Sequence, residues 1–136
     1  MSLTVYRKSH FNAAHRLYRP DWDDDKNNAV FGKCNNPNFH GHNYELEVGV
    51  TGDINQETGF LIDIEELKTI IKVEVEDYLD HKNLNLDIPE FKELNPTMEN
   101  IAVLIWDKLN ASLLGRFKIS VTLYETPRNF VVYTGN

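Results

Sequence analysis

The order in which hydrophobic periodicity changes along the chain is the strongest constraint on its fold. Two early segments, Leu3 to Ala14 and Tyr44 to Val50, have the strand-like character of half-buried β-structure. Apolar residues then recur every three or four positions from Ile64 to Tyr78 and from Ile101 to Leu113, as in amphipathic helices. Alternation returns from Phe117 to Tyr124, and a short apolar segment follows near the end of the chain.

This order predicts strand, strand, helix, helix, strand, strand, with the last strand at Phe130 to Tyr133. The predicted fold class is α+β, a four-stranded antiparallel sheet with both helices on one face, in a single domain over residues 1–136. Asn95 or Thr97 is expected to cap the second helix, and Gly115 to end it. Such a sheet has one bare face and unpaired edges, so we expect oligomerisation to cover them.

Two histidines separated by one glycine begin the second predicted strand, and a third histidine ends the first. Residues i and i+2 of a strand point to the same face, so His40 and His42 can direct both rings at one ion. Pairing of the two strands as a hairpin with a long insertion brings His15 opposite them. Three neutral imidazoles with an open fourth position are typical of a catalytic zinc site, because that position takes water or substrate.

Cys34 is the only cysteine, and five residues separate it from His40. One interpretation makes it a reactive thiol beside the metal ion. A second makes it a fourth structural ligand, which closes the site and leaves no chemistry. A third treats the histidines as hydrogen-bonded or surface residues without a metal. The spacing alone leaves all three open.

Two further features of the sequence could take part in catalysis. Asp80 could orient His81 as a proton shuttle, although an Asp-His pair at a helix end is by default a cap. Glu125 is predicted at the tip of the last hairpin, where glutamate is usually exposed; functionally, it could accept paired hydrogen bonds from an amidine-like N–H face. Residues 18–33 lack the spaced ligands of a calcium loop and are predicted to be a solvated loop.

Composition restricts the class of partner. The net charge of −7 argues against nucleic acid, no apolar run approaches membrane-spanning length, and no signal peptide is recognisable. One cysteine cannot form an internal disulfide, so we expect a protein of the reducing cytoplasm. A polyanionic substrate would need local cations. Those nearest in sequence, each interpreted by itself as an ordinary solvated charge, are Arg7, Lys8, Arg16, Arg19 and Lys33.

Six stretches of the chain resemble the 6-pyruvoyltetrahydropterin synthase family, which adopts the tunnelling fold. They are Phe11 to Leu17, Phe31 to Asn38, His40 to Tyr44, Leu79 to Asn85, Pro96 to Asn100 and Tyr124 to Thr126. Together they span nearly the whole chain, and Cys-x5-His-Gly-His is a specific motif. The resemblance implies trimers whose sheets close into a barrel and stack as homohexamers.

The resemblance also implies roles for the metal and catalytic residues. His15, His40 and His42 match the family's zinc ligands. Cys34 matches the catalytic thiol. Asp80 and His81 match the family's charge-relay partners of that thiol, which come from a neighbouring subunit.

The implied substrate is 7,8-dihydroneopterin triphosphate, which loses triphosphate and becomes 6-pyruvoyltetrahydropterin. Glu125 matches the glutamate of the catalytic set that anchors the pterin. Thr97 and Glu99 fall in the segment that lines the pterin pocket. The implied enzyme is a carbon–oxygen lyase of tetrahydrobiopterin-type biosynthesis that needs zinc and no redox cofactor.

Some positions depart from the animal members. Phe39 replaces a common glycine and could narrow the side-chain pocket, and Met98 replaces a second threonine. Residues 59–63 and 95–97 look more like the bacterial branch that makes 6-carboxytetrahydropterin for queuosine. The five-residue spacer and residues 79–84 favour the pyruvoyl branch. The carboxy-forming enzyme and a non-catalytic, zinc-stabilised oligomer are the alternatives.

Overall fold

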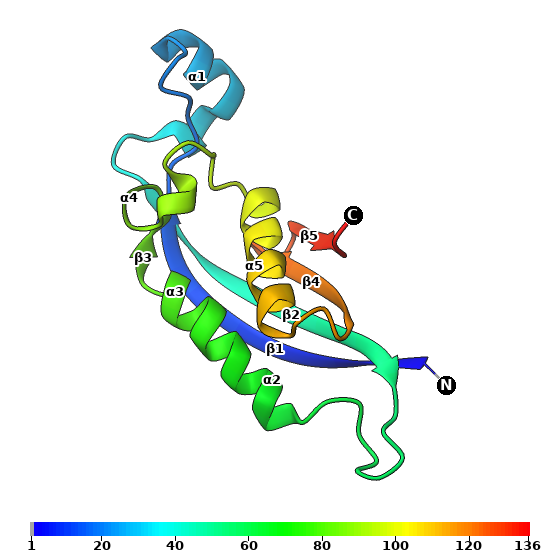
Figure 1. Cartoon of the computed structure of the whole chain (residues 1–136). Coiled ribbons are helices and arrows are strands. Elements are labelled where there is room, and N and C mark those ends of the chain that lie inside the picture. The colour runs from blue at the N-terminus through cyan, green and yellow to red at the C-terminus, as the bar shows by residue number, and fades with distance from the viewer. Residues whose placement is uncertain (1) are drawn as a thin grey trace.

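The computed structural model describes residues 2–136, and a five-stranded sheet with helices on one face forms its framework (Figure 1). The strands are β1 (Ser2–His15), β2 (His40–Asp53), β3 (Lys82–Asn83), β4 (Lys118–Tyr124) and β5 (Phe130–Tyr133). Their order in the sheet is β3-β1-β2-β4-β5. The antiparallel pairings β1–β2, β2–β4 and β4–β5 confirm the predicted α+β sheet, to which β3 adds a fifth, parallel strand.

β1 and β2 form a long antiparallel ribbon. Pairing runs from Ser2 opposite Asp53 to His15 opposite His40, so the two strands match over their full length. On the face toward the helices, alternate side chains such as Val48 are completely buried. The end of β1 and the start of β2 therefore meet at one end of the sheet.

Helices cover one face of this sheet (Figure 1). The helices of the structure are α1 (Asp24–Phe31), α2 (Ile64–Ile71), α3 (Asp77–Leu79), α4 (Leu84–Asp87) and α5 (Met98–Ser112), and α1 is not one of those that cover the sheet. A π-helical turn at Lys72–Glu76 joins α2 to α3, so the helix predicted from Ile64 to Tyr78 is present as one continuous rod. α5 packs against β4, where the Trp106 indole N–H donates to the Ile119 carbonyl at 2.9 Å. Both predicted helices are confirmed.

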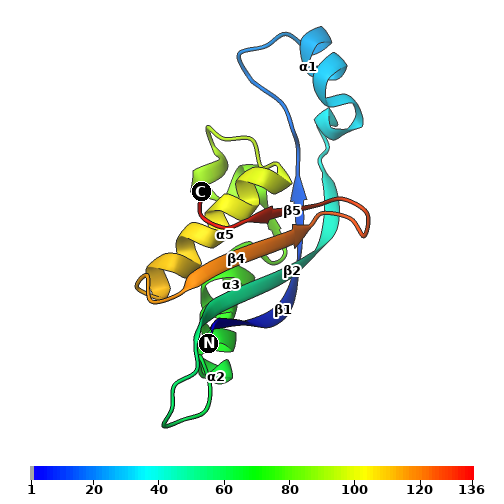
Figure 2. The ribbon, with the colours of Figure 1, turned by 90° about the vertical axis from the view of Figure 1, so that its right-hand side faces the viewer.

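The prediction of a solvated loop over residues 18–33 is wrong, because α1 forms within it. The Asp23 carboxylate accepts the Lys26 backbone N–H at 2.7 Å and caps the helix. Asp24 and Asp25 follow in the first turn, where the helix dipole favours negative charge. The aspartate run is therefore a helix start. α1 stands beyond the end of the sheet, away from the other helices (Figure 2).

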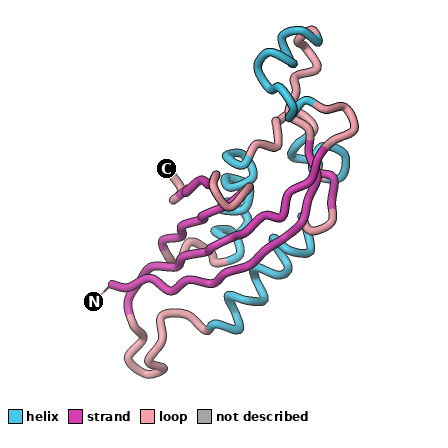
Figure 3. Tube along the Cα trace, turned by 180° about the vertical axis from the view of Figure 1, so that it is seen from behind, coloured by secondary structure: helices cyan, strands magenta, loops and turns pink. Residues whose placement is uncertain are grey.

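β3 was missed because two residues are too few to show a periodicity. After α3 ends, the His81 backbone N–H donates to the Asn12 carbonyl, and Lys82–Asn83 then pairs in parallel with the end of β1. Within residues 2–136, the opposite face of the sheet carries no helix (Figure 3). Exposed apolar side chains on that face include Tyr6 and Phe130.

Among residues 2–136, every helix is too short or too polar to cross a membrane.

Candidate metal centre and active site

Three imidazoles meet where β1 ends and β2 begins. The strand register places His15 directly opposite His40, and His42 follows on the same face of β2. One ring nitrogen of each residue lies within 4.8 Å of the other two. The ring centroids are 4.5 Å (His15–His40), 5.1 Å (His15–His42) and 5.0 Å (His40–His42) apart. The three histidines expected to converge do so.

The inner nitrogens of this group lack hydrogen-bond partners among the described residues. Among the described residues, His15 Nε2, His40 Nδ1 and His42 Nε2 are buried and make no hydrogen bond. A buried polar atom without a partner is costly, and a shared metal ion would remove that cost for all three. Three imidazole nitrogens suit a divalent ion that accepts nitrogen ligands, zinc among them.

His15 is fixed as a neutral ring with its lone pair toward the group. Its Nδ1 lies 2.7 Å from the Pro96 carbonyl oxygen; since a carbonyl can only accept, Nδ1 carries the proton and Nε2 is free to bind an ion. Burial lowers the pKa of His15 to about 4, against the smaller raising effect of the hydrogen bond to Pro96. Burial also lowers the pKa of His40. Both rings are therefore neutral at pH 7, the form that binds metal.

Cys34 lies beside the histidines but outside their group. It sits in the 3-10 turn Gly32–Asn35, and its carbonyl accepts the Leu17 N–H at 2.8 Å, which ties this turn to the end of β1. The residue lines a cavity of about 770 Å³ together with His40 and His42. In the described part of the chain, the ligand group contains the histidines alone. This arrangement favours a thiol near the ion over a fourth ligand.

Glu125 turns its carboxylate toward the histidines from the loop after β4. Oε2 lies 4.0 Å from His15 Nε2, and Oε1 lies 3.9 Å from His42 Nε2. The side chain is 22% exposed, so the default of a solvent-exposed hairpin tip does not hold. Burial raises the pKa of Glu125, with the His42 charge opposing and the Glu99 charge adding to the rise. Burial, and then the charge of Glu125, raise the pKa of Cys34.

The first turn of α5 lies next to the same site. Thr97 is its N-cap, and the hydroxyl accepts a backbone N–H of the first turn at 3.2 Å. The carbonyl of the preceding proline is the one that holds His15. Glu99 is near enough to Glu125 to raise the pKa of that carboxyl. The start of α5 is thus linked to the metal group through the Pro96 carbonyl and to Glu125 through Glu99, while the expected role of Thr97 and Glu99 in a pterin pocket stays a prediction.

Asp80 and His81 contact each other but not the cavity. Asp80 Oδ2 lies 2.9 Å from His81 Nδ1, while Oδ1 accepts the Asn12 backbone N–H at 2.8 Å. This bond to Asn12 is the main reason that the pKa of Asp80 is lowered, with His81 a smaller one. The His81 side chain is 82% exposed, and neither residue lines the cavity that contains Cys34. One chain by itself does not bring the pair to the thiol.

Sequence reasoning missed part of the cavity wall. Arg16 was interpreted as a solvated charge, yet it lines the cavity and bonds to the buried Asn35. The position of Arg16 directly after His15 was an available signal, whereas nothing in the sequence singled out Asn35. Phe39, which could narrow the side-chain pocket, lines a separate hollow with Tyr18 in the single chain.

The sequence and the fold of the chain are each similar to those of known proteins. Residues 4–136 match the family model described as 6-pyruvoyl tetrahydropterin synthase. The chain is 45% identical over 131 residues to 6-pyruvoyl tetrahydrobiopterin synthase of Homo sapiens, covering 96% of this chain and 90% of that protein. It is also 45% identical over 137 residues to the protein of that name from Dictyostelium discoideum, covering 99% of each. The solved Caenorhabditis elegans 6-pyruvoyl tetrahydropterin synthase superposes with a TM-score of 0.94 at 36% identity, covering 100% of this chain and 97% of that one.

Proposed function

Since the chain belongs to the 6-pyruvoyl tetrahydropterin synthase family, we propose that it is a zinc-dependent lyase acting on 7,8-dihydroneopterin triphosphate. Its product would be 6-pyruvoyltetrahydropterin, with release of triphosphate. The observation that carries this proposal is the set of three unpartnered ring nitrogens in the wall that also holds Cys34. A metal group next to an ionisable thiol supports proton abstraction from carbon.

The residues take separate roles in this proposal. His15, His40 and His42 would hold the zinc ion, and its positive charge would make the hydroxyls and adjoining C–H bonds of the substrate side chain more acidic. Cys34 would act as a thiolate and remove a carbon-bound proton, because the positive charge of a bound zinc ion would oppose the burial that raises the pKa of this thiol. Glu125 accepts hydrogen bonds from the N–H groups of the pterin ring. Its half-buried carboxylate, 3.9 Å from the His42 ring, fixes the ring of the substrate relative to the metal group.

The reaction balances without a redox partner. The carbon–oxygen bond to triphosphate breaks, and its electron pair leaves on the phosphate oxygen. The side-chain carbons are oxidised while the dihydropterin ring is reduced, so both changes occur within one molecule. Protons lost from carbon are relayed through the thiol and the Asp80-His81 pair.

Assembly of several chains would complete the site. Asp80 and His81 lie outside the Cys34 cavity of their own chain, which supports their delivery from a neighbouring subunit. The helix-free face of the sheet and its edge strands give a reason for association, because unpaired strand edges and exposed apolar side chains favour pairing with another copy. We propose trimers with a closed barrel, stacked as hexamers, acting in the cytoplasm as single-domain subunits.

Incubating the purified protein with dihydroneopterin triphosphate and identifying the products tests the proposal. Release of triphosphate with the pyruvoyl product supports it, and chelation of the metal should abolish that turnover. The carboxy product with acetaldehyde would instead identify the queuosine-pathway branch. If each chain binds one zinc ion through its histidines but no turnover occurs, the protein is a non-catalytic metalloprotein.

A further inference from the structure

The cavity beside Cys34 is larger than the metal group requires, and its wall also contains basic side chains. Its volume is about 770 Å³. His40, His42 and Glu125 line one part of it. Arg16 and Lys33 line another, together with polar amides of the segment between α1 and β2. The metal group therefore shares its cavity with two cations.

Arg16 is held rigidly in the cavity wall. The Asn85 side chain makes two hydrogen bonds to the Arg16 backbone. Its oxygen accepts the Arg16 N–H at 2.8 Å, and its amide nitrogen donates to the Arg16 carbonyl at 2.9 Å. The guanidinium Nε donates to the Asn35 carbonyl at 2.9 Å and to the Asn35 side-chain oxygen at 3.2 Å. The guanidinium carbon lies 3.9 Å from the centre of the Tyr18 ring. These contacts fix Nε and the plane of the group, and they leave its two terminal nitrogens uncommitted.

This partly buried guanidinium has no carboxylate partner among the described residues. Arg19, three positions on, is by contrast exposed and paired with Asp21 at 2.8 Å. A cation taken partly out of water without a counter-charge is unfavourable unless an anion binds to it. The planar, two-pronged donor of arginine suits phosphate oxygens. The side chain of Arg16 is therefore already positioned to bind an anionic ligand.

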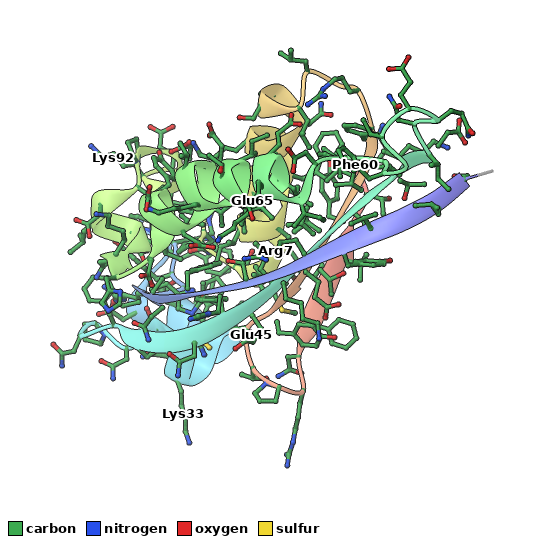
Figure 4. All side chains as sticks on the ribbon, turned by 90° about the horizontal axis from the view of Figure 1, so that it is seen from below. Arg7, Lys33, Glu45, Phe60, Glu65 and Lys92 are labelled. Atoms are coloured by element: carbon green, nitrogen blue, oxygen red, sulfur yellow. The ribbon has the colours of Figure 1, made fainter. Side chains whose placement is uncertain are left out.

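The other charges of the cavity locate that ligand. Glu125 places a carboxylate beside the metal group, and Asp24 contributes a further carboxylate to the lining. Lys33 adds an exposed amine on the turn that carries Cys34, and its side chain extends away from the ribbon (Figure 4). A flexible amine at that position can fold onto a polyanion that already contacts Arg16. A ring with N–H donors suits the carboxylate of Glu125, and phosphates suit the side chains of Arg16 and Lys33.

We propose that Arg16, assisted by Lys33, binds the triphosphate chain of the substrate and so directs the neighbouring hydroxyl-bearing carbon, from which a proton is removed, toward Cys34. This inference rests on the proposed function for the identity of the substrate. It assigns the leaving group to Arg16 as a substrate-binding residue, fixed by Asn35 and Tyr18. Arg16 then stabilises the negative charge that builds up on the departing phosphate oxygen.

Isothermal titration with inorganic triphosphate tests the site independently of turnover. Arg16→Gln should weaken triphosphate binding by about 10- to 100-fold, because it removes charge-assisted hydrogen bonds. Lys33→Gln should cause a smaller loss. Arg19→Gln is the matched control and should bind as the wild type does. Repeating the titration after chelation excludes binding of triphosphate through the metal, and metal content with thermal melting checks that each variant is folded.

Turnover data separate this inference from the proposed function. With dihydroneopterin triphosphate, Arg16→Gln should raise KM and lower kcat/KM while keeping the metal bound, and Arg16→Lys should recover part of the loss. Triphosphate binding by Arg16→Gln as tight as that of the wild type would overturn the inference, even if the pyruvoyl product forms. If triphosphate binding depends on Arg16 but no pyruvoyl product forms, the anion site is supported and the proposed function is overturned.

Discussion

At the scale of single residues, burial prepares His15 for metal binding before any ion arrives. The ring is completely buried, its Nδ1 proton is held by the Pro96 carbonyl, and burial lowers its pKa to about 4. The folded protein therefore excludes a proton from His15 that the unfolded chain accepts at mildly acidic pH. Metal affinity and acid stability depend on the same property, the neutrality of this ring.

The chelator-treated protein should lose stability as the pH falls from about 6.5 to about 4. Within this window the unfolded state binds a proton at His15 that the folded state does not, so the free energy of unfolding rises with pH. One proton contributes ~1.4 kcal/mol per pH unit, or roughly 3 kcal/mol over the window. Urea titrations at several pH values measure this slope. His15→Gln should reduce the dependence of the unfolding free energy on pH. The control, His10→Gln, changes an exposed histidine and should leave that dependence as it is in the wild type.

Cys34→Ala should abolish turnover and leave the metal bound. The thiol is the proposed base, and removal of a general base costs about 100- to 10,000-fold in rate. The histidine group does not include Cys34, so its zinc content should not change. Steady-state kinetics and metal analysis of the same preparation measure both properties, with Cys34→Ser as a second substitution of similar size. Loss of zinc from Cys34→Ala would show that the sulfur is a structural ligand.

Only the local part of this site could be predicted from the sequence. Strand alternation across one glycine placed His40 and His42 together, and hairpin pairing added His15. The burial of Glu125 and the lack of a counter-ion at Arg16 depend on tertiary contacts between distant segments. No periodicity encodes such contacts, so residue patterns alone left both side chains as ordinary surface charges.

At the scale of elements, the start of α5 links helix stability to the site. Thr97 caps the helix through its hydroxyl, directly after the proline carbonyl that orients His15. Thr97→Ala should therefore destabilise the protein by about 1 kcal/mol, the usual cost of losing a cap. Thr97→Ser keeps the hydroxyl and should recover most of that stability in urea unfolding. Equal stability of the two variants would show that the cap contributes nothing.

Element prediction succeeded where the periodic pattern is long and failed where a segment is short or signalled by polar residues. β1, β2, α2 and α5 follow their apolar patterns. α1 was missed because its start signal is a set of aspartates that also suits a solvated loop. β3 has two residues, and only its contact with β1 defines it.

At the scale of the whole molecule, the proposed active site needs two subunits. Mixing Cys34→Ala and His81→Ala chains during refolding tests this directly. Each variant alone should be inactive, but random mixing gives about a quarter of the sites an intact Cys34 and an intact neighbouring His81. Turnover of the mixture should therefore recover toward that fraction of wild-type activity. A mixture as inactive as its components would show that Cys34 and His81 do not cooperate across an interface.

The most direct test of the account is X-ray absorption spectroscopy at the zinc edge of the metal-loaded protein. The structure places three imidazole nitrogens around the site and leaves Cys34 outside their group. The account predicts nitrogen and oxygen neighbours at about 2.0–2.1 Å and the same spectrum for Cys34→Ala. A sulfur neighbour at about 2.3 Å that disappears in Cys34→Ala would contradict it.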